Sequence, residues 1–164
     1  MSGQSVLLVP FPEVAVVVEP WLEQSVGARP SHGIPAHVTL LFPFPPDEDP
    51  GPVLRDVRAF DVAFRELRRF AEAPALYLAP EPASTFVSLT KALVARFPDW
   101  PPYGGAFAEI VPHLTVAWGA ALDEAEAAVA PSLPLHGRAR EAVLLSEVEL
   151  QRWQVRATFA FEDA

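Results

Sequence analysis

The chain of 164 residues contains no cysteine. This absence excludes disulfide bonds, a thiolate nucleophile and cysteine-ligated zinc. Basic residues are also scarce, since 12 lysine and arginine side chains stand against 21 aspartate and glutamate side chains, for a net charge of −9. A protein that wraps long nucleic acid must neutralise many phosphates. The charge balance therefore opposes an extended nucleic-acid track, whereas a small phosphorylated ligand or one end of an RNA would need only a local site; the charge limits substrate size more than substrate chemistry.

Long hydrophobic runs are missing as well. The longest uncharged run, residues 30–46, contains five prolines and is unsuited to crossing a membrane as a helix. The first residues have no basic region ahead of an apolar run, so no secretory signal is expected. Apolar residues make up 51% of the chain, which is ample for a packed core. We expect a cytoplasmic monomer with no membrane partner.

Two stretches of the sequence repeat one short pattern. "PAHVTLLFPF" (residues 35–44) and "VPHLTVAWG" (residues 111–119) each place a histidine two residues before a threonine, followed by an aliphatic residue and preceded by a proline. Two of the four histidines in the chain lie in these motifs. Such a repetition requires a structural or functional cause.

The segments around the two motifs also correspond. Residues 4–11 predict a strand, residues 14–26 a helix interrupted by Pro20, and residues 36–42 a strand. In the second half, "ALYLAP" predicts a strand, the spacing of Phe86, Leu89, Leu93 and Phe97 predicts a helix, and residues 112–118 predict a strand. The remaining predicted elements are a short helix at 53–58, a strand at 60–70, a helix at 122–130 and strands at 142–148 and 153–161.

This correspondence predicts a duplicated strand-helix-strand-helix-strand unit and an α+β fold. We expect a single bilobal domain with pseudo-repeat halves of approximately 1–72 and 73–164. A pseudo-two-fold axis between the halves would bring the two motifs face to face.

The spacing within each motif has a direct structural meaning. Residues i and i+2 of a strand point to the same face, so His37 and Thr39 should project together, as should His113 and Thr115. The neighbours that alternate with them should point into the core; these are Val38, Leu40, Leu114 and Val116.

Two imidazoles that face one site suit displacement at a phosphodiester. One histidine removes a proton from the attacking hydroxyl and the other protonates the departing oxygen, because an imidazole titrates near neutral pH. The threonine hydroxyls can donate hydrogen bonds to the non-bridging oxygens. A metal site is the competing interpretation, but neither motif carries a third ligand at a typical short spacing. We therefore predict no metal and no cofactor.

The paired "HVTL" and "HLTV" motifs resemble those of the two-histidine (2H) phosphoesterase superfamily, and within it the 2′-5′ RNA ligase-like branch. The resemblance covers nearly the whole chain. It implies antiparallel sheets around a central cleft, metal-independent reaction at cyclic phosphates or 2′-5′ linkages, and catalytic roles for His37, Thr39, His113 and Thr115. Many members of that branch carry an arginine five residues after the second histidine, where this sequence has Trp118. Candidates to replace its positive charge are Arg29, Lys91 and Arg156.

Other residues carry weaker signals. Tyr103 lies in a glycine-bearing loop ten residues before His113; its ring could stack on a nucleobase, or it could anchor the loop. The aromatic residues that follow the motif strands, Trp118, Phe42 and Phe44, fit the core better than a platform for a nucleobase. The two remaining histidines, His32 and His136, fit the surface.

We therefore predict a metal-independent phosphodiesterase that acts on small RNA-derived phosphodiesters. The alternative is a non-catalytic module on the same fold that binds nucleotides or RNA ends.

Overall fold

The computed structural model describes residues 4–23, 34–71, 73–106, 109–149 and 152–163. Two residues singled out from the sequence, Arg29 and His32, lie outside these ranges. Among the described helices, none combines the length and apolar character required to cross a membrane.

Strands and helices follow the predicted order, with one additional strand, β6 (Leu135–Ala139), that was not predicted. The first unit runs β1 (Ser5–Pro10), α1 (Pro12–Glu23), β2 (His37–Phe44), α2 (Gly51–Leu54) and β3 (Phe60–Arg69). The second runs β4 (Ala75–Glu81), α3 (Ala83–Arg96), β5 (Leu114–Trp118), α4 (Leu122–Val129) and β6 (Leu135–Ala139), and is followed by β7 (Glu141–Glu149) and β8 (Arg152–Ala160). Two short 3₁₀ turns are η1 (Pro102–Gly105) and η2 (Ala130–Ser132).

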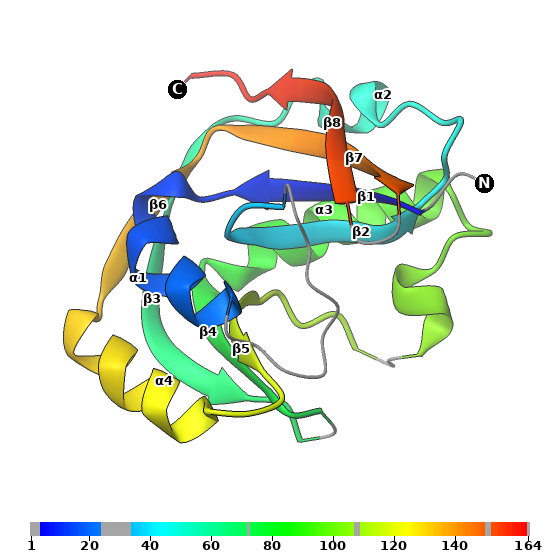
Figure 1. Ribbon diagram of the computed structural model, residues 1–164. Coiled ribbons are helices and arrows are strands. Elements are labelled where there is room, and N and C mark those ends of the chain that lie inside the picture. The colour runs from blue at the N-terminus through cyan, green and yellow to red at the C-terminus, as the bar shows by residue number, and fades with distance from the viewer. Residues whose placement is uncertain (1–3, 24–33, 72, 107–108, 150–151, 164) are drawn as a thin grey trace.

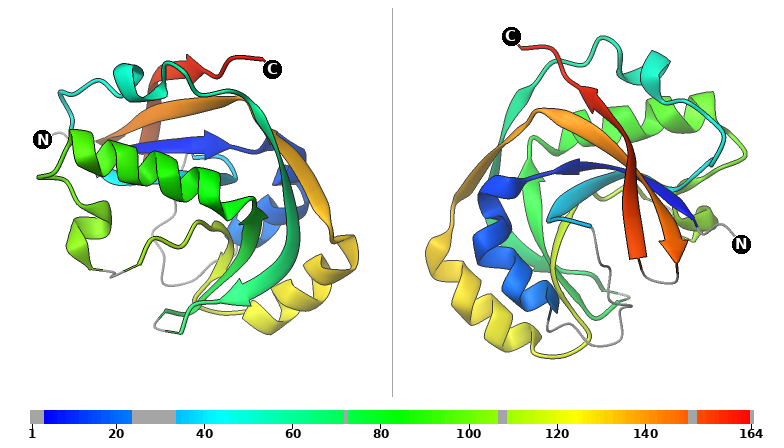
Figure 2. Two further views of the ribbon diagram at one scale, coloured as in Figure 1. Left: turned by 180° about the vertical axis from the view of Figure 1, so that it is seen from behind. Right: turned by 45° about the horizontal axis from the view of Figure 1, so that its top comes forward.

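The strands form two antiparallel four-stranded sheets, as Figure 1 shows. The first sheet has the order β2-β1-β7-β8 and the second has the order β5-β4-β3-β6. The α+β class with antiparallel sheets is thereby confirmed. Each sheet takes strands from both halves of the chain, because β3 joins the second sheet and β7 joins the first. The two sheets are linked through the consecutive strands β6 and β7 (Figure 2).

Both motif strands lie at the edge of a sheet, β2 in the first and β5 in the second. An edge position suits β2, because Pro43 within it has no backbone N–H for a second ladder. The strands β2 and β5 also contact each other across the boundary between the sheets. The two copies of the motif are thus brought to the same region of the fold.

The main core is shared by both sheets and the helices that cover them. Phe11 and Phe64 meet edge to face with ring centroids 5.2 Å apart, and Phe86 of α3 packs against Phe11. A smaller cluster on the other face of the first sheet consists of Val6, Leu8, Val143 and Leu145, with Ile34, Phe42 and Trp153 packed against it. Burial of these apolar side chains is the main driving force for the fold.

The observed helix boundaries differ from the predicted ones at two points. The predicted helix at 53–58 is corrected to α2 at Gly51–Leu54, because Pro50 and Pro52 favour a helix start and not its interior. Helix α1 continues past Pro20 to Glu23, although a proline interrupts the predicted pattern. Strand β3 and helix α3, which ends just before Phe97 and Pro98, agree with the prediction.

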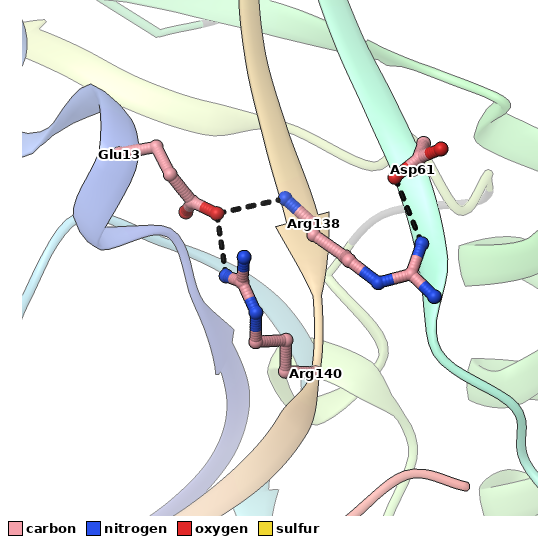
Figure 3. Close-up of polar contacts among 4 residues, drawn as sticks. All are labelled: Glu13, Asp61, Arg138 and Arg140. Atoms are coloured by element: carbon pink, nitrogen blue, oxygen red, sulfur yellow. Dashed lines mark hydrogen bonds and ion pairs between the residues drawn. The ribbon is translucent and has the colours of Figure 1, made fainter. Parts of the chain in front are cut away.

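A polar network fixes α1 against the strands (Figure 3). Oε2 of Glu13 accepts hydrogen bonds from the backbone N–H of Arg138, at 3.1 Å, and from the guanidinium of Arg140, at 2.6 Å, while the side chain of Arg138 bonds Asp61 at 2.8 Å. Burial raises the pKa of Glu13, but the bonds to Arg140 and Arg138 outweigh that effect and hold it below its ordinary value. The network ties α1 to β6 and β3.

Candidate active site

The first motif occupies the start of β2. Thr39 lies opposite Leu8 of β1, and His37 lies opposite Pro10. Val38 and Leu40 are fully buried, whereas His37 and Thr39 are half-buried. The alternation predicted for the strand is therefore present, and the polar pair lies on the face of the first sheet that also carries Leu8.

The second motif has the same arrangement on β5. Thr115 lies opposite Tyr77 of β4, and His113 directly precedes the strand. Leu114 and Val116 are fully buried, while His113 and Thr115 are half-buried. We call the face of the second sheet that carries Thr115 and Tyr77 its motif face.

Both imidazoles are held in the same tautomer by the backbone. Nδ1 of His37 is 2.7 Å from the carbonyl oxygen of Pro35, and Nδ1 of His113 is 2.8 Å from the carbonyl oxygen of Val111. A carbonyl only accepts hydrogen bonds, so Nδ1 carries the proton in each ring. The other nitrogen, Nε2, is the one left for proton transfer in both histidines.

The two imidazoles are electrostatically coupled. Burial lowers the pKa of His37 to about 4, the bond to Pro35 opposes this shift, and the positive charge of His113 lowers the pKa further. Burial also lowers the pKa of His113 below its ordinary value, against the bond to Val111. The charge of His113 thus acts on the imidazole of His37.

The backbone around the first motif is fixed by long-range hydrogen bonds. The N–H of Ala36 donates to Oε2 of Glu19 at 3.1 Å, and the N–H of Phe11 donates to the carbonyl of Ala36 at 2.9 Å. On the other side of the motif, Oγ1 of Thr90 in α3 donates to the carbonyl of Leu40 at 2.7 Å. These contacts hold both ends of the His-x-Thr segment in place.

Aromatic rings support His113. The ring of Phe70 meets the imidazole edge to face with centroids 4.9 Å apart, and Tyr77 lies 5.8 Å from it. Phe70 and Tyr77 stack on each other at 4.4 Å. Neither residue was predicted from the sequence, because the contact depends on how β3, β4 and β5 are aligned.

A second aromatic group lies beside Thr39. Burial raises the pKa of Tyr103, and a hydrogen bond with the side chain of Thr39 opposes the shift. The ring of Tyr103 is 6.1 Å from that of Phe42, which is in turn 6.3 Å from that of Trp153. Tyr103 has a left-handed backbone, φ 52°, within the turn η1. Tyr103 therefore contacts the first motif, although the second motif lies nearer to it in the sequence.

The remaining predicted residues are dispersed. Phe44 is fully buried and packs on Phe97, as expected of the core. Trp118 does not belong to the buried clusters, which corrects the expectation for it: it is half-buried at the end of β5, opposite Ala75. His136 is exposed on β6, in agreement with a surface histidine. Within the described ranges, no three His, Asp or Glu side chains converge in a way that would hold a metal ion.

Comparison with known protein families shows to which family the chain belongs. The model of the 2′-5′ RNA ligase superfamily matches residues 10–155, which include both motifs. The chain belongs to the 2′-5′ RNA ligase superfamily. No match was found among curated proteins.

Solved structures share the fold of this superfamily member at low sequence identity. Escherichia coli LigT complexed with 3′-AMP is 11% identical with a TM-score of 0.61, and the alignment covers 99% of each chain. The complex of the same protein with NADP⁺ is 14% identical with a TM-score of 0.63 over 98% of each chain. The protein TT0787 of Thermus thermophilus is 20% identical with a TM-score of 0.63 over 98% of each chain.

Proposed function

We propose that this superfamily member is a metal-independent phosphodiesterase that acts on small RNA-derived phosphodiesters, either 2′,3′-cyclic phosphates or 2′-5′ linkages. The observation that carries the proposal is the matched state of His37 and His113. Each donates Nδ1–H to a backbone carbonyl and keeps Nε2 for chemistry, and the charge of one lowers the pKa of the other.

The unequal pKa values favour one division of roles. His37, with a pKa of about 4, is neutral over most of the pH range and acts as the base. His113, whose pKa is lowered by burial against the opposing bond to Val111, acts as the acid. In hydrolysis of a 2′,3′-cyclic phosphate, Nε2 of His37 takes a proton from water as the water oxygen bonds to phosphorus. Nε2 of His113 gives a proton to the ribose oxygen as its bond to phosphorus breaks. Each transfer contributes roughly 10²–10⁴-fold to the rate.

The threonines bind the same phosphate. The hydroxyls of Thr39 and Thr115 donate hydrogen bonds to its non-bridging oxygens, where negative charge builds up in the transition state. Because Thr39 is bonded to Tyr103 in the free protein, that bond is exchanged for one to the phosphate when the substrate enters.

Tyr103 also contacts the nucleobase. Its ring, with those of Phe42 and Trp153, forms a group of aromatic surfaces next to Thr39, and an aromatic ring that stacks on a base contributes about 1–3 kcal/mol. LigT is described in complexes with 3′-AMP, ATP and NADP⁺, which supports a small nucleotide as the ligand. The net charge of −9 supports the same size of substrate, since long RNA would meet repulsion beyond the site.

A panel of 2′,3′-cyclic nucleotides, 2′-5′ dinucleotides and RNA ends with a cyclic phosphate tests the proposal, with and without chelator. We expect turnover of at least one mononucleotide or dinucleotide, unchanged by EDTA and weakly dependent on salt. Binding without turnover of any member would favour the non-catalytic module. Activity lost in EDTA and restored by a divalent cation would favour a metal mechanism.

A further inference from the structure

The arginine that the resemblance implies five residues after His113 is absent, because that residue is Trp118. Of the described candidates suggested by the sequence, Lys91 lies on the exposed side of α3. Arg156 donates to the carbonyl of Pro46 at 2.8 Å and lies 3.4 Å from Oγ of Ser146. Neither is aligned with the second motif.

Arg68 is aligned with it by the register of the second sheet. Arg68 of β3 lies opposite Tyr77 of β4, which lies opposite Thr115 of β5. Directly opposed residues in antiparallel strands share a face, so the three side chains form one row across the motif face. Neighbouring strands are about 4.8 Å apart, which separates the backbones of β3 and β5 by about 10 Å. A guanidinium on this row therefore lies near the reacting phosphate but not at it.

A pocket occupies the same part of the motif face. Its lining includes Arg68, Tyr77, Ala79, Glu81, Val111 and Pro112. Val111 and Pro112 immediately precede His113, whereas neither imidazole lines the pocket. The pocket therefore lies next to His113, whose imidazole is 5.8 Å from the ring of the lining residue Tyr77.

The charges around this pocket leave Arg68 available to an anion. Its guanidinium bonds Oε2 of Glu66 at 2.8 Å and also the side chain of Tyr77. The side chains of Arg68 and Glu66 are 54% and 58% exposed, so solvent screens this ion pair and it contributes little to stability. Glu81, the acidic residue of the lining, is itself paired with Arg65 at 3.3 Å. A phosphate can therefore take the place of Glu66 at little cost.

We propose that this pocket is a second phosphate subsite, in which Arg68 binds a phosphate of the substrate other than the one that reacts. The inference rests on the proposed function, which puts the reacting phosphate between His37 and His113. A guanidinium pairs with phosphate oxygens in a two-pronged, charge-assisted geometry, and Tyr77 adds a hydroxyl at the same wall. The subsite selects nucleotides that carry a second phosphate group over nucleosides with a single cyclic phosphate.

Binding of two nucleotides that the proposed reaction does not cleave tests the subsite independently of turnover. Adenosine 3′,5′-bisphosphate and adenosine 3′-monophosphate are titrated calorimetrically into the wild type, Arg68→Gln, Arg68→Lys and Arg69→Gln. Arg69 is the matched control, because it is the next residue of β3 and pairs instead with Asp123 and Glu126 of α4.

We expect the wild type to bind the bisphosphate roughly three- to tenfold more tightly than the monophosphate, because the two-pronged pairing of a guanidinium with a phosphate is stronger than its screened pair with Glu66. Arg68→Gln should lose that preference, Arg68→Lys should keep part of it, and Arg69→Gln should keep all of it. An equal loss for both ligands in Arg68→Gln would mean that Arg68 contacts the reacting phosphate, and would overturn the subsite. The subsite would also be overturned if the wild type bound both nucleotides equally tightly or did not bind the bisphosphate. Failure of turnover alone would count against the proposed function and leave this result standing.

Discussion

Leu40 and Val116 occupy the same position relative to the two motifs: each is the extra residue of a β-bulge directly after the threonine. On β2, Thr39 pairs with Leu8 and Leu41 pairs with Leu7, which leaves Leu40 without a partner. On β5, Thr115 pairs with Tyr77 and Ala117 pairs with Leu76, which leaves Val116 without one. Both bulged side chains are buried. The aliphatic residue of each His-x-Thr-aliphatic pattern thus anchors a local bend that aims the polar pair.

The bulge at Leu40 depends on Thr90. A bulged residue is left out of the strand ladder, and the carbonyl of Leu40 is satisfied by the buried hydroxyl of Thr90 at 2.7 Å. Thr90→Val should lower the free energy of unfolding by about 1–3 kcal/mol, because a buried acceptor loses its partner. It should also lower kcat/KM through Thr39. Urea denaturation and initial rates provide the measurements.

Thr158→Val, at an exposed position of β8, is the matched control and should change stability by less than about 0.5 kcal/mol. Equal changes in the free energy of unfolding for the two substitutions would show that the hydrogen bond from Thr90 to Leu40 does not stabilise the fold.

The pH dependence of kcat/KM should be bell-shaped and displaced to acid. Below pH about 4, His37 gains a proton and no longer accepts one. As the pH rises through the pKa of His113, which lies below its ordinary value of 6.5, His113 loses the proton that it must donate. Rates with 2′,3′-cyclic AMP between pH 3.5 and 9 provide the test. An alkaline limb above pH 7 would contradict the assignment of His113 as the acid.

The depressed pKa of His37 should also make stability depend on pH. As the pH falls from about 6.5 to about 4, the unfolded chain takes up a proton at this position and the folded protein does not, so stability falls over that window. Above pH 6.5 the contribution of His37 is fully present. His37→Gln should reduce the loss of stability between pH 7 and pH 4.5, measured by urea denaturation. His136→Gln, at an exposed position of β6, serves as the control, and a wild-type-like loss in His37→Gln would refute the linkage.

The contributions of the ring and of the hydroxyl of Tyr103 can be measured separately. Tyr103→Ala removes the surface next to Phe42 and should raise KM for a cyclic mononucleotide by roughly 5- to 150-fold, the equivalent of about 1–3 kcal/mol of lost stacking. Tyr103→Phe keeps the ring and removes the hydroxyl that bonds Thr39, so its KM should stay within about twofold of the wild type. Steady-state kinetics of the two variants decide the matter. An unchanged KM in Tyr103→Ala would leave the residue as a loop anchor only.

Local patterns were sufficient to predict the motif strands. The alternation of His37 and Thr39 with Val38 and Leu40 follows from the two-residue period of a strand. The α+β class followed from the order of the predicted strands and helices, and the antiparallel sheets from the resemblance.

The surroundings of the motifs could not be predicted in this way. Phe70 and Tyr77 contact His113, and Arg68 is aligned with Thr115, only through the arrangement of three strands, and Thr90 reaches Leu40 from a helix 50 positions away. The strand β6 is another example, because "LHGRA" has neither β-branched residues nor a clear alternation, and no strand was predicted there. Such contacts depend on tertiary alignment, which a single sequence does not encode locally.

The central claim is that His37 and His113 together catalyse phosphodiester cleavage without a metal. Its most direct measurement is kcat for a 2′,3′-cyclic nucleotide in excess EDTA, for the wild type, His37→Gln, His113→Gln and the double variant. The account predicts full wild-type activity and a loss of roughly 10²–10⁴-fold in each single variant. The double variant should lose much less than the product of the two, because the residues act as a unit. Wild-type activity that requires a divalent cation, or a single variant that retains its kcat, would contradict it.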